Sequence, residues 1–118
     1  MIDPAEAKAL AALLVGMAEP TRLLILYRLA GGPKSVGQVA EQVGVSLVNA
    51  SHHLGVMWWA GLLDRESQGR QVIYSLLPKL FTPGGAPGEL GTLDLGAYRL
   101  TLLDRRAVKT APKLRKRT

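Results

Sequence analysis

The sequence predicts a mainly α-helical fold with a small β-hairpin, arranged as a winged helix-turn-helix and followed by one additional C-terminal strand. Two observations indicate this fold class. Apolar residues with helical spacing fill 36–43 and 47–60, and only a short turn that contains glycine separates the two segments. Directly afterwards, over 62–76, the spacing changes to that of two short strands joined by the turn Gln-Gly-Arg. A helix-turn-helix followed at once by a hairpin is the winged-helix order.

Each of the four predicted helices has a start signal in the sequence. Either a capping side chain that accepts backbone N–H bonds precedes the helix, or a proline occupies its first position. The signals and helices are Asp3 and Pro4 for 4–17, Pro20 for 20–30, Ser35 for 36–43, and Ser46 for 47–60. The last helix is expected to turn toward the core Leu47 or Val48, Ala50, His53 or Leu54, and Met57.

The segment after residue 77 has a different pattern. Residues 78–91 are rich in proline and glycine and are expected to be irregular. Over 92–102 leucines alternate with polar residues, and the alternation changes phase at Gly96, which predicts a strand with a glycine bulge. We therefore expect three parts: a winged helix-turn-helix domain at 1–80, a Pro/Gly-rich segment and strand at 81–104, and a basic tail at 105–118.

Composition and length indicate one globular domain. The chain has 118 residues, of which 47% are apolar and 20% are charged, and this suits a single hydrophobic core. It has no cysteine, which excludes disulfides, thiolate metal ligands and cysteine nucleophiles. Charged residues interrupt the apolar N-terminal run, so we expect neither a signal peptide nor a membrane span, and we expect a cytoplasmic protein.

Charge is concentrated at the C-terminus. Residues 105–118 hold seven of the 15 lysines and arginines and no acid, whereas residues 1–104 hold eight basic and nine acidic residues, a net charge of −1. The tail has too few apolar residues for a core and is expected to be disordered. A neutral body with a cationic tail suggests a polyanionic partner, although such a tail can also serve only solubility.

Four stretches of the chain together resemble a known family. They are MAEPTRLLILYRLA, SVGQVAEQVGVS, ASHHLGVMWWAGLL and GRQVIYSL, and their order and spacing are similar to those of the ArsR/SmtB family of winged-helix transcriptional repressors. The resemblance covers residues 10–77. It implies a homodimer in which the helix 47–60 enters the major groove of double-stranded DNA, while the hairpin reaches the minor groove or the backbone.

The metal sites of that family do not carry over to this chain. They use cysteines on the helix equivalent to 36–43, or Asp and His ligands on a C-terminal dimerisation helix. Here cysteine is absent, and the only histidines, His52 and His53, are helix neighbours that point about 100° apart. We expect no metal and no cofactor. The C-terminal helix is also not apparent, so the dimer interface is expected to use the helix 4–17 and the strand 92–102.

Candidate DNA contacts lie on the outer face of the helix 47–60 and around the hairpin turn. They are Ser46, Leu47, Val48, Asn49, Ser51 and His52 on the helix, and Arg65, Gln68, Arg70 and Gln71 on the hairpin. Asparagine pairs with adenine, serine bonds bases or phosphates, and leucine or valine contacts thymine methyl groups. The hairpin side chains have the chemistry to reach phosphate or a narrow minor groove, and the alternative for any single one is a solvated hairpin tip.

The paired histidines and tryptophans each have two interpretations. The resemblance implies that His52 faces DNA and that His53 packs inward as a hydrogen-bonded structural residue. One of Trp58 and Trp59 is expected to pack under the hairpin and the other to be at least partly exposed. The exposed indole either covers apolar surface at the edge of the domain or binds a partner.

The sequence thus predicts a sequence-specific DNA-binding transcriptional repressor, a homodimer on an inverted-repeat operator. The alternative is a winged-helix module that binds protein or RNA without sequence-specific DNA binding. No arrangement of catalytic residues is visible, so the chain is not expected to be an enzyme, and no membrane partner is expected.

Overall fold

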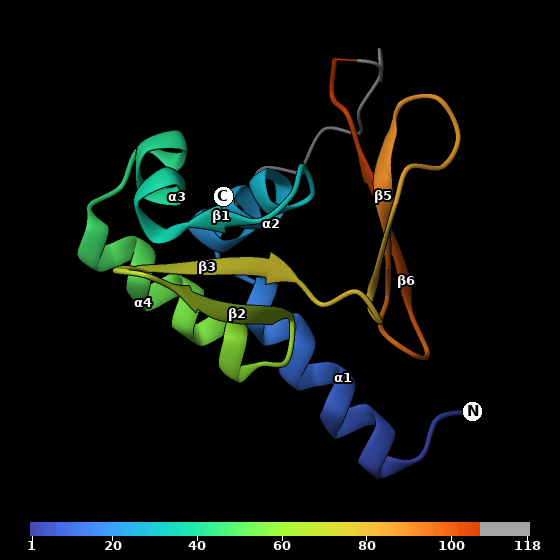
Figure 1. Cartoon of the computed structure of the whole chain (residues 1–118). Coiled ribbons are helices and arrows are strands. Elements are labelled where there is room, and N and C mark those ends of the chain that lie inside the picture. The colour runs from blue at the N-terminus through green and yellow to red at the C-terminus, as the bar shows by residue number, and fades with distance from the viewer. Residues whose placement is uncertain (107–118) are drawn as a thin grey trace, which may run out of the picture.

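A computed structural model describes residues 1–106, so most of the basic tail lies outside the described residues. Four helices precede and flank the first of two small antiparallel sheets (Figure 1). The helices are α1 (Pro4–Met17), α2 (Pro20–Leu29), α3 (Val36–Val43) and α4 (Leu47–Trp59). The strands are β1 (Lys34–Ser35), β2 (Leu63–Gln68), β3 (Gln71–Leu76), β4 (Phe81–Pro83), β5 (Glu89–Asp94) and β6 (Arg99–Leu103). The fold is the predicted winged helix-turn-helix, with a second sheet added.

The predicted helix starts are confirmed by their caps. The Asp3 carboxylate accepts a bond of 2.8 Å from the backbone N–H of Glu6, and the Ser46 hydroxyl accepts one of 3.1 Å from the backbone N–H of Asn49. Ser35 and Gln38 bond each other's backbone N–H groups reciprocally, which is a complete capping box for α3. The bonds of Ser35 and Ser46 fix the residues at which α3 and α4 begin.

The core lies between α2, α3, α4 and the hairpin β2–β3, which we call the wing (Leu63–Leu76). Ile25, Val39, Leu54, Met57 and Leu62 are fully buried. Each side chain of this kind contributes about 1.5–3 kcal/mol when it leaves water. The core of α4 consists of Ala50, Leu54 and Met57. The expectation that Leu47 or Val48 would share this inward face is wrong, because both are exposed, by 59% and 77%.

The wing and the short strand β1 form a three-stranded sheet with the order β1-β3-β2. Gln68 pairs with Gln71, which leaves Gly69 and Arg70 as a two-residue turn at the tip. Gly69 has a φ of +62°, a left-handed conformation that glycine adopts without strain. The short strand β1 was not predicted, because two residues carry no readable alternation. It pairs Ser35 with Ile73 and so ties the cap of α3 directly to the wing.

The second sheet, with the order β4-β5-β6, replaces the single bulged strand expected over 92–102. That expectation is wrong: Gly96, with a φ of +92°, lies in a turn that reverses the chain. The reversal pairs Leu93 with Leu100, and the irregularity in the register lies instead between Glu89 and Gly91. Part of the segment expected to be irregular forms β4, which pairs Phe81 with Leu93.

Helix α1 projects from the body in Figure 1 and is packed mainly near its C-terminal end. Of its 14 residues only Leu10, Gly16 and Met17 are buried. A Cβ placed on Gly16 would lie 2.5 Å from the Cβ of Ala60, so glycine permits the close approach of α1 to the end of α4. Among residues 1–106 no single helix is long and apolar enough to span a membrane; α1 and α2 meet that test only as a pair bent by 92°.

Candidate nucleic-acid interface

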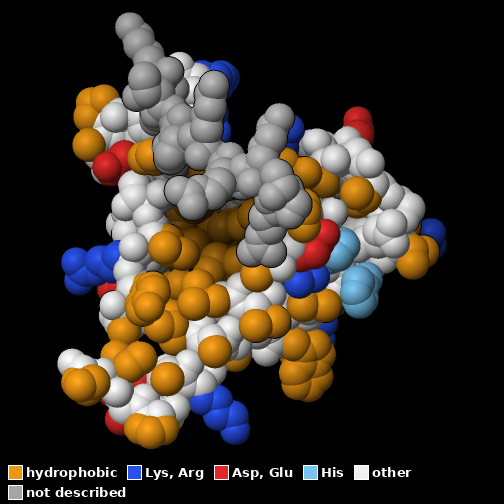
Figure 2. Space-filling view, turned by 180° about the vertical axis from the view of Figure 1, so that it is seen from behind, with side chains coloured by type: hydrophobic (Ala, Val, Ile, Leu, Met, Phe, Trp, Pro, Cys, Tyr) orange, Lys and Arg blue, Asp and Glu red, His pale blue; other side chains and the backbone are white. Residues whose placement is uncertain are grey.

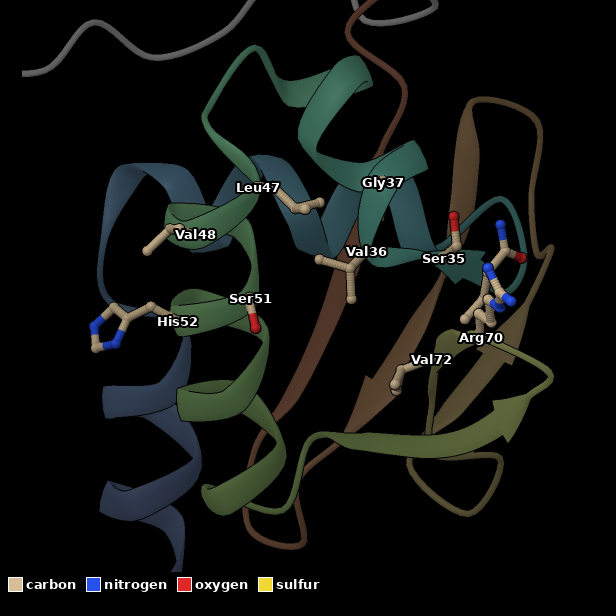
Figure 3. Close-up of a pocket in the computed structure, with 10 residues that line it drawn as sticks. Ser35, Val36, Gly37, Leu47, Val48, Ser51, His52, Arg70 and Val72 are labelled. Atoms are coloured by element: carbon tan, nitrogen blue, oxygen red, sulfur yellow. The ribbon is translucent and has the colours of Figure 1, made fainter.

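A groove of about 760 Å³ lies between the first half of α4, the start of α3 and the wing (Figure 3). We call it the α4–wing groove. The turn after Gly44 sets α4 across α3, and the pairing of β1 with β3 holds the wing beside both helices. Six of the ten predicted DNA contacts line this groove. They are Leu47, Val48, Ser51, His52, Arg70 and Gln71.

The exposed side of α4 presents two rows of side chains. In Figure 3, Leu47 and Ser51 point toward α3 and the wing, whereas Val48 and His52 point to the other side of the helix. Each row joins residues four apart, which lie above one another on a helix. None of these four residues belongs to the hydrophobic core.

The other four predicted contacts do not line the groove. Ser46 and Asn49 are exposed on the first turn of α4, where Ser46 is occupied as the cap. Gln68 is exposed at the tip of the wing, opposite Gln71. Arg65 lies elsewhere: its guanidinium stacks 3.7 Å from the ring centre of Trp58, a cation–π contact between β2 and the end of α4.

The two tryptophans divide as the sequence predicted. Trp58 is half-buried beneath Arg65, whereas Trp59 is 83% exposed. Their rings meet edge to face, with centroids 5.4 Å apart. Trp58 therefore supports the wing, and Trp59 stands at the end of α4 that is remote from the groove.

The two histidines also face different surroundings, as the resemblance implied. His52 is exposed on α4, and the side chain of His53 is only 17% exposed. The guanidinium of Arg22 lies 3.1 Å from Nδ1 of His53. Glu19 lies 3.6 Å from the same nitrogen. His53 thus joins α4 to the start of α2.

Glu19 and Arg22 were not singled out from the sequence. The Glu19 carboxylate caps α2 by accepting a bond of 3.0 Å from the backbone N–H of Arg22. Desolvation pushes the pKa of Glu19 upward, but bonds from the backbone N–H groups of Arg22 and Thr21 and the nearby charges of His53 and Arg22 hold it below its usual value. The proline after Glu19 was the available signal, although glutamate is not a favoured cap.

The described residues, 1–106, contain no cluster of three or more His, Cys, Asp or Glu side chains that would hold a metal ion. The rings of His52 and His53 are 5.3 Å apart and inclined by 62°. The absence of metal binding remains a prediction.

Comparison with known proteins now identifies the family. A family model, bacterial regulatory protein of the arsR family, matches residues 19–65, from the cap of α2 into β2. The HTH-type transcriptional regulator YgaV of Escherichia coli is 40% identical over 73 residues, which are 61% of this chain and 74% of YgaV. This chain belongs to the ArsR family. The sequence resemblance and the predicted fold class are both confirmed.

Other relatives of this ArsR-family chain agree. The HTH-type transcriptional regulator NmtR of Mycobacterium tuberculosis is 37% identical over 75 residues, which are 64% of this chain. The match spans 62% of NmtR, less than two thirds of the length of that relative. A solved structure of a homodimeric winged helix-turn-helix DNA-binding domain from Mycobacterium bovis superimposes with a TM-score of 0.61 at 28% identity, covering 64% of this chain and 69% of the other. The family match includes α4 but ends before β3, so strands β4 to β6 lie outside it.

Proposed function

We propose that this ArsR-family regulator is a sequence-specific transcriptional repressor that binds an inverted-repeat operator as a homodimer. One observation supports DNA reading above the others: the exposed rows of α4 and the tip of the wing border the same groove. The major groove of B-DNA, about 12 Å wide, admits a helix, and a neighbouring wing then meets the flanking backbone.

The side chains of this surface fall into two groups, one suited to contacting bases and the other to positioning the protein on the DNA backbone. Asn49 offers both a donor and an acceptor to an adenine edge, and Ser51 and His52 offer hydrogen bonds beside it. At the tip of the wing Arg70 and Gln71 are exposed, and their side chains have the donors that bind backbone phosphate. We therefore assign base contacts to α4 and phosphate contacts to the wing.

A homodimer explains the exposure of α1 and α2. Apolar side chains gather on the face of the molecule shown in Figure 2, and Val15, Leu23, Leu24 and Tyr27 are each at least 40% exposed. Two copies related by a two-fold axis would cover such a face and place two α4 helices about 34 Å apart, one DNA turn. The homodimeric state of the Mycobacterium bovis domain supports this arrangement.

In this mechanism the dimer represses by occupying its operator. The two α4 helices bind successive major grooves on one side of the duplex, and RNA polymerase cannot use a promoter that overlaps the site. Strand β6, at the edge of the second sheet, offers a further pairing surface between the two copies.

The test is selection of duplexes by the full chain from a random-sequence pool, followed by footprinting of the tightest site. Asn49→Ala and His52→Ala should each weaken the selected site by about 1–3 kcal/mol and leave random duplex unchanged. Trp59→Ala, at the far end of α4, is the matched control and should alter neither. Equal losses on selected and random duplex would contradict base reading, and binding of RNA or protein in place of duplex would favour the interaction-module alternative.

A further inference from the structure

The first turn of α4 carries two aliphatic residues that the fold does not use. Leu47 is 59% exposed and Val48 is 77% exposed, whereas the helix buries Ala50, Leu54 and Met57. Neither residue belongs to the hydrophobic core or to the apolar residues packed against it. Their identities are therefore not set by packing.

Local helix stability does not explain the pair either. The first turn of a helix favours acidic residues, and α4 has none there. Valine is β-branched and is a poorer helix former than the straight-chain polar residues. The cap is provided by Ser46, whose bond to the Asn49 N–H does not depend on the side chains at 47 and 48. The identities of Leu47 and Val48 are therefore best explained by a ligand that contacts this surface.

The other residues of α4 limit which chemical group of a ligand Leu47 and Val48 can contact. Its sequence, LVNASHHLGVMWW, contains no arginine or lysine to pair with guanine and no carboxylate to accept from cytosine. On the edges of base pairs in the major groove the one apolar group is the C5-methyl of thymine. Leu47 borders the α4–wing groove together with Val36 and Val72, so a methyl group placed against it would leave water.

We propose that Leu47 and Val48 determine operator specificity by contacting thymine C5-methyl groups. This inference rests on the proposed function and deepens it: each half-site carries thymines opposite the first turn of α4. Both side chains line the groove but, as helix neighbours, point about 100° apart (Figure 3), so each meets a different methyl group. Asn49, the next residue along the chain, is available to an adenine of the same A·T-rich segment.

The experiment removes single methyl groups from DNA. The tightest duplex selected by the full chain is resynthesised with deoxyuridine in place of each thymine in turn. At one or more positions in each half-site we expect binding to weaken about fourfold, the factor for losing burial of one methyl-sized group. In Leu47→Ala or Val48→Ala the loss at the matching position should fall to nearly onefold. Trp59→Ala, about 18 Å along the helix, should retain the full loss.

Further variants keep the test decisive. Leu47→Met retains an apolar side chain and should preserve a thymine preference that Leu47→Ser abolishes, while melting temperatures confirm that all variants fold. If duplexes with deoxyuridine bind as tightly as those with thymine at every position, this proposal is overturned, while sequence-specific repression remains intact. A methyl preference that persists unchanged in both alanine variants also overturns it. If the full chain selects no duplex, this proposal and the proposed function both fail.

Discussion

At the scale of single residues, Glu19 connects charge to stability. Its pKa is held below the usual value of 4.5 in the fold, so its ionised form stabilises the folded state above that pH. As the pH falls through the lowered value, the carboxylate takes up a proton and this stabilisation is lost. The interaction joins the cap of α2 to His53 on α4, next to the face proposed to read DNA.

We therefore predict that Glu19→Gln lowers the melting temperature at pH 7 and that its difference from the unaltered chain closes as the pH falls below 4.5 and through the lowered pKa of Glu19. Glutamine keeps an acceptor oxygen for the Arg22 N–H but carries no charge, so the variant isolates the charge. Thermal melts from pH 3 to pH 7 measure this difference. A difference that stays constant with pH would show that the carboxylate acts only through its shape and hydrogen bond.

Gly16 and Gly55 form a matched pair that tests the close approach of α1. Both glycines lie within helices, but a Cβ on Gly16 would lie 2.5 Å from that of Ala60, whereas a Cβ on Gly55 meets nothing within 4 Å. We predict that Gly16→Ala destabilises the fold by about 1–3 kcal/mol through overpacking. Gly55→Ala should stabilise it by about 0.5–1 kcal/mol through helix propensity. Urea unfolding measures both, and equal effects would contradict the packing of α1 on the end of α4.

Residue by residue, the sequence was most informative where the signal is local. The capping roles of Asp3, Ser35 and Ser46 follow from short-range spacing and were predicted. The inward face of α4 was only partly predicted, because apolar residues at 47 and 48 satisfy a helical period whether they meet the core or a ligand. The contact of Arg22 with His53 spans 31 residues, and a single sequence carries no signal for such a pair.

At the scale of elements, the contrast between the two sheets is informative. The wing was predicted because its two strands flank a Gln-Gly-Arg turn and follow a helix directly. The β5–β6 hairpin was misread as one strand, since a phase change at a glycine fits either a bulge or a chain reversal. A local signal did distinguish them: the Asp94 carboxylate accepts a bond of 3.0 Å from the Gly96 N–H, an Asx turn that Asp-x-Gly favours.

Helix α1 packs against the rest of the monomer mainly near its C-terminal end, and it provides a test of dimerisation. Val15 is 64% exposed on it, and a lysine there would be desolvated in a two-fold interface. We predict that Val15→Lys weakens dimerisation about tenfold or more and leaves helix content unchanged. Gln42→Lys, at an exposed position of α3, is the control and should sediment like the unaltered chain. If Val15→Lys also sediments unchanged, α1 is not in the interface.

At the scale of the whole molecule, the distribution of charge indicates that one part of the chain selects the DNA sequence and another part attracts the DNA. Residues 1–106 hold ten basic and nine acidic residues, a net charge of +1, and α4 contributes no lysine or arginine to the proposed interface. Such a surface selects bases by hydrogen bonds and apolar contacts but draws the protein only weakly to a polyanion. Attraction then depends on the residues beyond Arg106, where five of the 15 basic side chains and no acid are found.

The tail therefore carries the last prediction, that it strengthens binding without choosing the sequence. A chain ending at Arg106 keeps all of the described residues, including the Asp104–Arg106 ion pair of 3.1 Å, and removes five positive charges. Each phosphate that the tail neutralises adds about 0.9 to the slope of log K against log salt, so the shortened chain should show a flatter plot on selected and random duplex alike. A full-length variant with the five residues changed to glutamine separates charge from length. Coinciding slopes would show that the tail does not bind DNA, and a collapse of the ratio of selected to random affinity would show that it reads sequence.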